Sequence, residues 1–130
     1  MLAVYNNNRN LAKEDISGNL EPFFWLGDTA WLLAQKLTAD EANVYFADRA
    51  KKKFNVIQTV LVHNMNVEEP EEEITAIIDN DFSKICSTGG YWEKIDILVE
   101  MAAEYGLYMG LLPVWGSMVK KAVSYTHLRA

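Results

Sequence analysis

The sequence of 130 residues predicts an α/β fold with a parallel sheet, and three observations lead to this class. Short apolar runs alternate with stretches in which apolar residues recur every three or four positions, the pattern of strands alternating with amphipathic helices. One run, residues 54–62, is apolar on both faces, as is typical of a parallel strand covered on both sides. Half of the residues are apolar and 23% are charged, a composition that supports a hydrophobic core.

The chain is expected to begin with a short β-ribbon over residues 1–22. An Asn-rich turn follows the apolar residues Leu2–Tyr5, and Ser17-Gly18-Asn19 marks a second turn. The aromatic run Phe23–Leu26 comes next and stops at Gly27, which predicts a short buried strand.

Two helices and two further strands complete the prediction. Thr38 with Glu41 forms a capping box, and the apolar spacing that follows predicts a helix before the strand at 54–62. Residues 63–90 are less regular; we expect a long loop there, with an acidic solvated segment and a helical turn at 74–78. Helical spacing resumes at Trp92 and ends near Gly106, before a last buried strand over 107–116.

This order implies a parallel sheet with right-handed crossovers, for which two architectures compete. A nucleotide-binding doubly wound sheet carries a Gly-rich turn after its first strand, and Gly27-Asp28-Thr29-Ala30 does not fit that pattern. We therefore favour the N-terminal part of a (β/α)8 barrel over residues 23–123, with about three strands, because a whole barrel needs about 250 residues.

Composition excludes several functions. Twelve Lys+Arg against 18 Asp+Glu give a net charge of −6, which argues against nucleic acid as a partner. Cys86 is the single cysteine, and His63 has no partner at metal-ligand spacing, so neither a disulfide nor a metal or other cofactor is expected. The apolar runs are too short for a membrane span. The N-terminus does not resemble a signal peptide, so a cytoplasmic location is expected unless an export signal lies upstream.

Polar and aromatic residues near the carboxyl ends of the predicted strands are the candidate site, because barrel active sites lie at that edge. Carboxylates and amides bind sugar hydroxyls, and Trp rings stack on sugar C–H faces, so these residue types suit a carbohydrate. The candidate substrate-binding residues are Asp28, Trp31, Gln58, His63, Asn64 and Trp115.

Each candidate also has a structural interpretation. Asp28 is suited to capping a short helix over residues 29–35, and Trp31 and Trp115 are suited to a core. A lone amide such as Gln58 within an apolar strand needs a buried partner or a ligand. The structural interpretation of His63 is an ordinary loop histidine.

Seven blocks in one order resemble the apiosidase-like glycoside hydrolases, and the resemblance extends from Leu2 to about Lys121. The blocks are Pro22–Trp31, Leu37-Thr38 with Glu41-Ala42, Asp48-Arg49-Ala50, Phe54–Gln58, Gly89–Trp92 with Asp96, Ala102–Tyr108 and Gly110–Gly116. The resemblance implies a (β/α)8 barrel that hydrolyses glycosidic bonds in plant or microbial polysaccharide.

That chemistry needs two carboxyl groups, which the resemblance places on strands four and seven of such a barrel. We therefore expect no catalytic residue here and no activity from this polypeptide alone. Residues 124–130 break the family pattern and resemble translated adapter read-through at the end of a metagenomic contig, so a non-native tail is expected. Two alternatives stay open: a non-catalytic carbohydrate-binding or structural barrel, and a small complete α/β domain with an interaction role.

Overall fold

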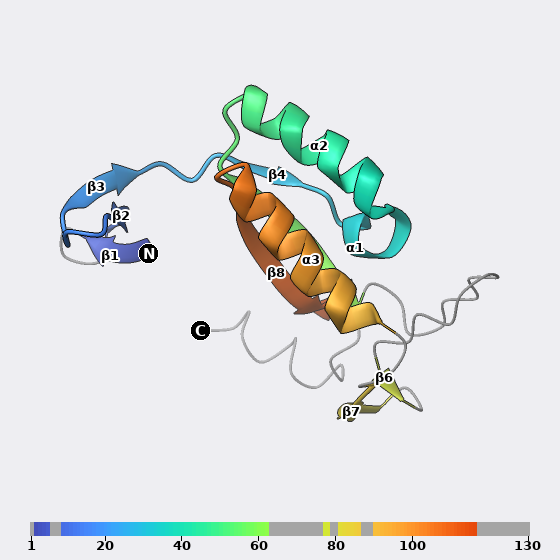
Figure 1. Ribbon diagram of the computed structural model, residues 1–130. Helices are drawn as coiled ribbons and strands as arrows, with labels where there is room; N and C mark the ends of the chain where they lie inside the picture. Colours follow the sequence, from blue (N-terminus) through green and yellow to red (C-terminus); the bar gives the residue numbers. More distant parts are fainter. Residues whose placement is uncertain (1, 6–8, 63–76, 79–80, 87–89, 117–130) are drawn as a thin grey trace.

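The computed structural model describes residues 2–5, 9–62, 77–78, 81–86 and 90–116 (Figure 1). In these ranges the fold is α/β, as predicted. The elements in chain order are β1 (Leu2–Tyr5), β2 (Asn10–Glu14), β3 (Leu20–Phe23), β4 (Gly27–Thr29), α1 (Leu33–Lys36), α2 (Ala39–Lys51), β5 (Val56–Val62), β6 (Ile77–Ile78), β7 (Asp81–Ile85), α3 (Tyr91–Glu104) and β8 (Tyr108–Val114).

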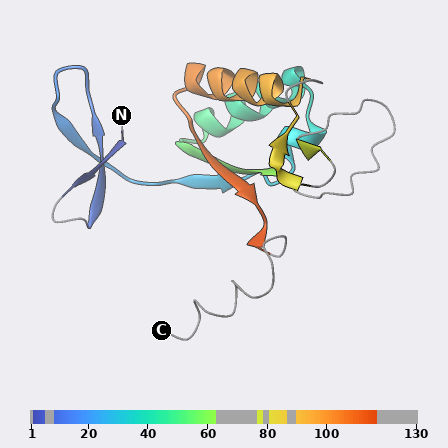
Figure 2. The same cartoon turned by 90° about the horizontal axis from the view of Figure 1, so that it is seen from below.

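The N-terminal ribbon is confirmed as an antiparallel sheet of order β1-β2-β3. Asp15 closes the second turn, because its Oδ1 accepts the backbone N–H groups of Ser17 and Asn19 at 2.8 and 2.9 Å. Figure 2 shows this sheet to one side of the α/β part. An edge-to-face contact between Phe23 and Tyr108, with ring centroids 5.4 Å apart, joins the two parts.

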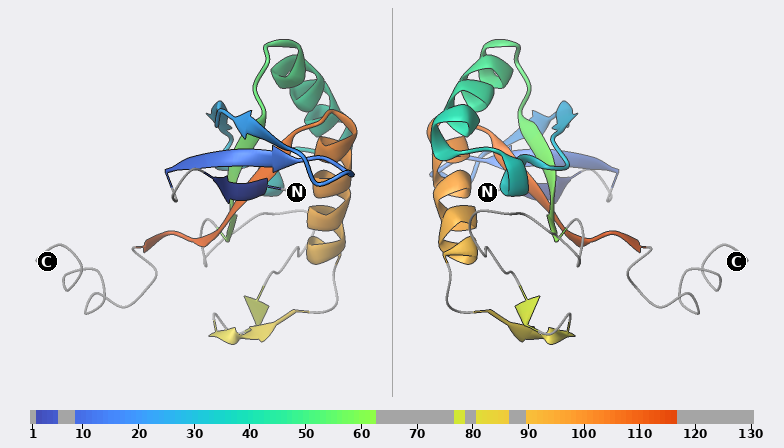
Figure 3. Two further views of the ribbon diagram at one scale, coloured as in Figure 1. Left: turned by 90° about the vertical axis from the view of Figure 1, so that its left-hand side faces the viewer. Right: turned by 90° about the vertical axis from the view of Figure 1, so that its right-hand side faces the viewer.

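A second sheet of order β4-β5-β8 is parallel throughout, as the alternating pattern predicts. Helices α2 and α3 lie on the same side of it (Figure 3). Both crossovers therefore place their helices on one face, as they do in part of a (β/α)8 barrel. The central strand β5 is buried on both faces, since Val56, Ile57 and Val60 are fully buried.

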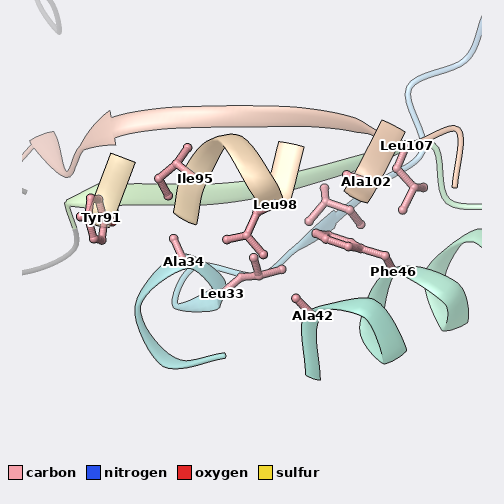
Figure 4. Packing of buried hydrophobic residues seen from close by; sticks show 10 residues of the cluster. Leu33, Ala34, Ala42, Phe46, Tyr91, Ile95, Leu98, Ala102 and Leu107 are labelled. Carbon is pink, nitrogen blue, oxygen red and sulfur yellow. The ribbon is translucent and has the colours of Figure 1, made fainter. Parts of the chain in front are cut away.

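The core lies between the helices and this sheet (Figure 4). Phe46 of α2 and Leu98 of α3 are at most 1% exposed and belong to the same cluster as Ile57 of β5. The predicted capping box of α2 is present: Thr38 Oγ1 accepts from Glu41 N at 3.3 Å, and Glu41 Oε2 accepts from Thr38 N at 2.8 Å. The helix therefore begins where the sequence signal places it.

The first parallel strand is not where its apolar run predicts. Phe24 is 80% exposed, and β4 begins only at Gly27, which pairs with Val56. Residues 24–26 connect the two sheets instead, because their backbone groups form hydrogen bonds with the Asn55 side chain. Its Oδ1 accepts from Leu26 N at 2.8 Å, and its Nδ2 donates to Phe24 O at 2.6 Å.

Two helical predictions are also wrong. Helix α1 begins at Leu33, with Leu32 as its N-cap and no side-chain cap, so Asp28 does not cap it. Residues 77–78 form strand β6, which pairs with β7 in a hairpin, where the prediction was a helical turn.

Several predictions fall outside the described residues: His63, Asn64, the acidic segment and residues 124–130. The domain boundaries at residues 22 and 123 stay predictions. No helix in the described ranges is both long and apolar enough to cross a membrane.

Candidate functional site

The carboxyl ends of β4, β5 and β8 meet at one edge of the parallel sheet, and two of the predicted site residues meet there. Trp31 lies just beyond β4 and Trp115 just beyond β8. Their ring centroids are 5.1 Å apart with planes at 68°, an edge-to-face pair. Such a pair contributes about 0.5–1.5 kcal/mol beyond its buried area. Both residues are half-buried, so the pair combines a fixed geometry with partial exposure to solvent.

Strand β5 holds the backbone of Trp31 although β4 has already ended. Ala30 N donates to Gln58 O at 2.8 Å, and Val60 N donates to Trp31 O at 3.4 Å. The parallel hydrogen-bonding pattern thus continues into the loop, and the start of that loop is fixed to the central strand.

Gln58 lies on the face of the sheet opposite the helices, between two glycines. A Cβ on Gly110 would lie 3.3 Å from Gln58 Cγ, and a Cβ on Gly27 would lie 3.6 Å from Gln58 Oε1. The Cβ placed on Gly27 would also lie 2.9 Å from Trp25 Nε1. The Gln58 amide is therefore directed toward the amino end of β4, near Trp25 and away from the edge that carries Trp31.

Asp28 lies on the helical face, because its register partner Ile57 belongs to the core beneath α2 and α3. Asp28 Oδ2 accepts from Tyr45 Oη at 2.8 Å and forms an ion pair with Arg49 Nε at 2.5 Å. Asp28 Oδ1 accepts from Thr29 N at 2.9 Å. Burial, together with the bond to Asp28, raises the pKa of Tyr45 to about 12.

The sequence analysis missed Tyr45 and Arg49 as partners of Asp28, and Trp25 as a neighbour of Gln58 at the amino end of β4. Tyr45 and Arg49 are four residues apart, a spacing that places them on one face of a helix, and this is the signal that could have paired them with one carboxylate. Trp25 was assigned to a buried strand. Across the described ranges, no group of three or more His, Cys, Asp or Glu side chains could hold a metal ion.

Comparisons with solved structures define the class of protein. A protein described as a glycoside hydrolase matches with a TM-score of 0.66 and 35% identity, over 91% of this chain and 26% of its own. A glycoside hydrolase family 5 protein from Bacteroides vulgatus matches with a TM-score of 0.71 and 29% identity, over 94% of this chain and 26% of its own. The fold is thus that of part of a glycoside hydrolase barrel, and the chain spans about a quarter of each of these proteins.

The family is equally clear. The family model of the apiosidase-like catalytic domain matches residues 5–129, and the chain belongs to this family. A search of curated proteins finds no match.

Proposed function

We propose that the chain supplies a sugar-binding edge to a glycoside hydrolase that acts on plant or microbial polysaccharide. The observation that carries the proposal is the Trp31–Trp115 pair, at the edge where barrel enzymes bind their substrates. Aromatic rings of fixed orientation present a flat apolar surface to the C–H face of a sugar. Family membership and the two glycoside hydrolase neighbours support the same substrate class.

Catalysis is assigned to carboxylates outside this chain. Glycosidic hydrolysis needs two carboxyl groups on either side of the bond, about 5–9.5 Å apart. Asp28 is a poor candidate for either role, because Tyr45 and Arg49 already occupy its carboxylate on the helical face. His63 and Asn64, which follow β5 directly, are proposed as further sugar contacts at the same edge.

Binding of the 130-residue chain to soluble arabinoxylan and pectin, one neutral and one acidic polysaccharide, tests the sugar-binding part. In affinity electrophoresis, each polysaccharide should retard the wild-type chain. W31A and W115A should each lower the affinity obtained from this retardation about tenfold, as expected for the loss of an aromatic anchor. W25A is the matched control, because it makes the same change at the amino end of β4. An equal loss of affinity in all three variants would contradict the proposal, and so would unchanged affinity in all three.

The same samples test the assignment of catalysis. We expect no release of reducing ends from either polysaccharide by the chain alone. Release by the wild-type chain would place the catalytic carboxylates within these residues. Binding by a longer natural protein that also lacks hydrolysis would favour the non-catalytic carbohydrate-binding alternative.

A further inference from the structure

The Asp28 carboxylate is held by two hydrogen-bond donors and one cation, and two of these three groups come from one helix. Tyr45 Oη and Arg49 Nε both contact Oδ2, at 2.8 and 2.5 Å, and both residues belong to α2. The third group, the backbone N–H of Thr29, donates to Oδ1 at 2.9 Å. The carboxylate therefore connects α2 to the backbone at the end of β4.

The side chains of Tyr45 and Arg49 are themselves held in place. The Tyr45 ring packs on Phe46, with centroids 5.9 Å apart, and Phe46 is fully buried in the core. Arg49 Cζ lies 4.9 Å from the Tyr45 ring centroid and 5.7 Å from that of Phe54. Arg49 Nη1 also donates to Asp48 Oδ2 at 3.0 Å. Because ring and ionic contacts restrict both side chains, they act as fixed supports for Asp28.

From Asp28 the chain reaches Trp31 in three residues, and that segment is fixed from two sides. The Asp28 carboxylate accepts a hydrogen bond from Thr29 N at the start of this segment, and hydrogen bonds with β5 hold residues 30 and 31 at its end. Strand β4 itself is only three residues long, so its own pairing is a weak constraint. The contacts of Asp28 supply the constraint that a longer strand would provide.

We propose that Asp28 is a positioning residue: Tyr45 and Arg49 hold its carboxylate, which in turn fixes the backbone that presents Trp31 to Trp115. The sugar-binding consequence rests on the proposed function above, whereas the positioning itself does not. This role replaces direct sugar contact as the function of Asp28. It also assigns a part in ligand binding to Tyr45, which lies on the helical side of the sheet.

Variants Y45F and D28N test the proposal in the full chain, with N43A as the matched control. Asn43 also lies on α2 and accepts a hydrogen bond at 2.7 Å, from Tyr105 Oη, but it is not part of the Asp28 cluster. Two close indole rings give an exciton couplet in the far-ultraviolet circular dichroism spectrum, which reports the geometry of Trp31 and Trp115 directly. Thermal unfolding of each variant verifies that it is folded.

We expect Y45F to reduce the couplet and to weaken binding of arabinoxylan or pectin about threefold, the effect of one lost hydrogen bond. D28N should weaken binding of the same polysaccharides about tenfold. N43A should leave both unchanged. An unchanged couplet in Y45F, or an equal loss in N43A, would overturn the positioning role. Loss of binding in D28N with normal binding in Y45F would instead make Asp28 a direct sugar contact. A reduced couplet in a chain whose wild type binds neither polysaccharide would support the positioning role and refute the proposed function.

Discussion

Replacing Asn55 by alanine should detach the segment that joins the two sheets. The Asn55 side chain accepts from Leu26 N at 2.8 Å and donates to Phe24 O at 2.6 Å, contacts that span 29 and 31 positions of the chain. A net contribution of about 1 kcal/mol for each hydrogen bond gives a loss of about 2 kcal/mol in the free energy of unfolding. Asn55→Asp should be less stable still, because it sets a carboxylate oxygen against the Phe24 carbonyl.

Urea unfolding of the full chain measures the total effect, and amide hydrogen exchange at Leu26 measures the local one. In Asn55→Ala we expect a lower unfolding midpoint with an unchanged slope, and about 30-fold faster exchange of the Leu26 amide, the factor that corresponds to about 2 kcal/mol. Asn43→Ala, which loses one hydrogen bond from Tyr105, should cost about half as much and leave the Leu26 amide protected relative to its neighbours. An unaltered midpoint together with unaltered Leu26 exchange in Asn55→Ala would refute the reasoning.

Three further predictions concern helix ends and pH. Thr38→Ala removes the capping box of α2 and should lower stability by about 1 kcal/mol in thermal unfolding, whereas Thr38→Ser, which keeps the hydroxyl, should lose much less. Lys53 has a φ of 69°, so Lys53→Gly should raise stability by about 0.5–1 kcal/mol, and a gain of the same size in Lys53→Ala would argue against relief of backbone strain. Burial raises the pKa of Tyr91 to about 12 from an ordinary value of 10.0. The folded state therefore keeps the Tyr91 phenol proton that the unfolded state loses. Tyr91 alone should lower stability by up to about 3 kcal/mol as the pH rises from 10 to 12, and Tyr91→Phe should remove that part of the decline.

Local signals predicted the elements that local interactions determine. The Thr38–Glu41 capping box marks the start of α2 because both of its hydrogen bonds lie within four residues. The apolar β-branched run around Val56 identifies β5 because burial on both faces leaves no polar alternation. Gly106 correctly predicts where α3 ends. Its φ of 72° lies in the left-handed region, which favours glycine.

Elements fixed by distant partners were misplaced. The aromatic run at Phe23–Leu26 indicates burial, but Asn55 determines which backbone groups pair there, and no local pattern contains that contact. Similarly, Asp28 could not be assigned to the helical face until the register between Gly27 and Val56 was known, since a shift of one residue reverses the face.

For the candidate site, the strand topology predicts which residues share an edge of the sheet but not the direction of their side chains. Parallel strands end at one edge, which accounts for the proximity of Trp31 and Trp115. The direction of the Gln58 amide depends on the glycines beside it, which composition alone does not reveal. Sugar contact by any of these residues stays a prediction.

The narrow space between β5 and β8 has an evolutionary consequence. Because a methyl group at position 110 would lie 3.3 Å from Gln58 Cγ, the two positions share one volume across neighbouring strands. An alanine at position 110 would require the Gln58 side chain to move by a few tenths of an ångström, and a larger side chain there favours a shorter or redirected side chain at position 58. Substitutions at Gly110 and Gln58 should therefore occur as pairs across the family, a covariation that records the alignment of these two strands.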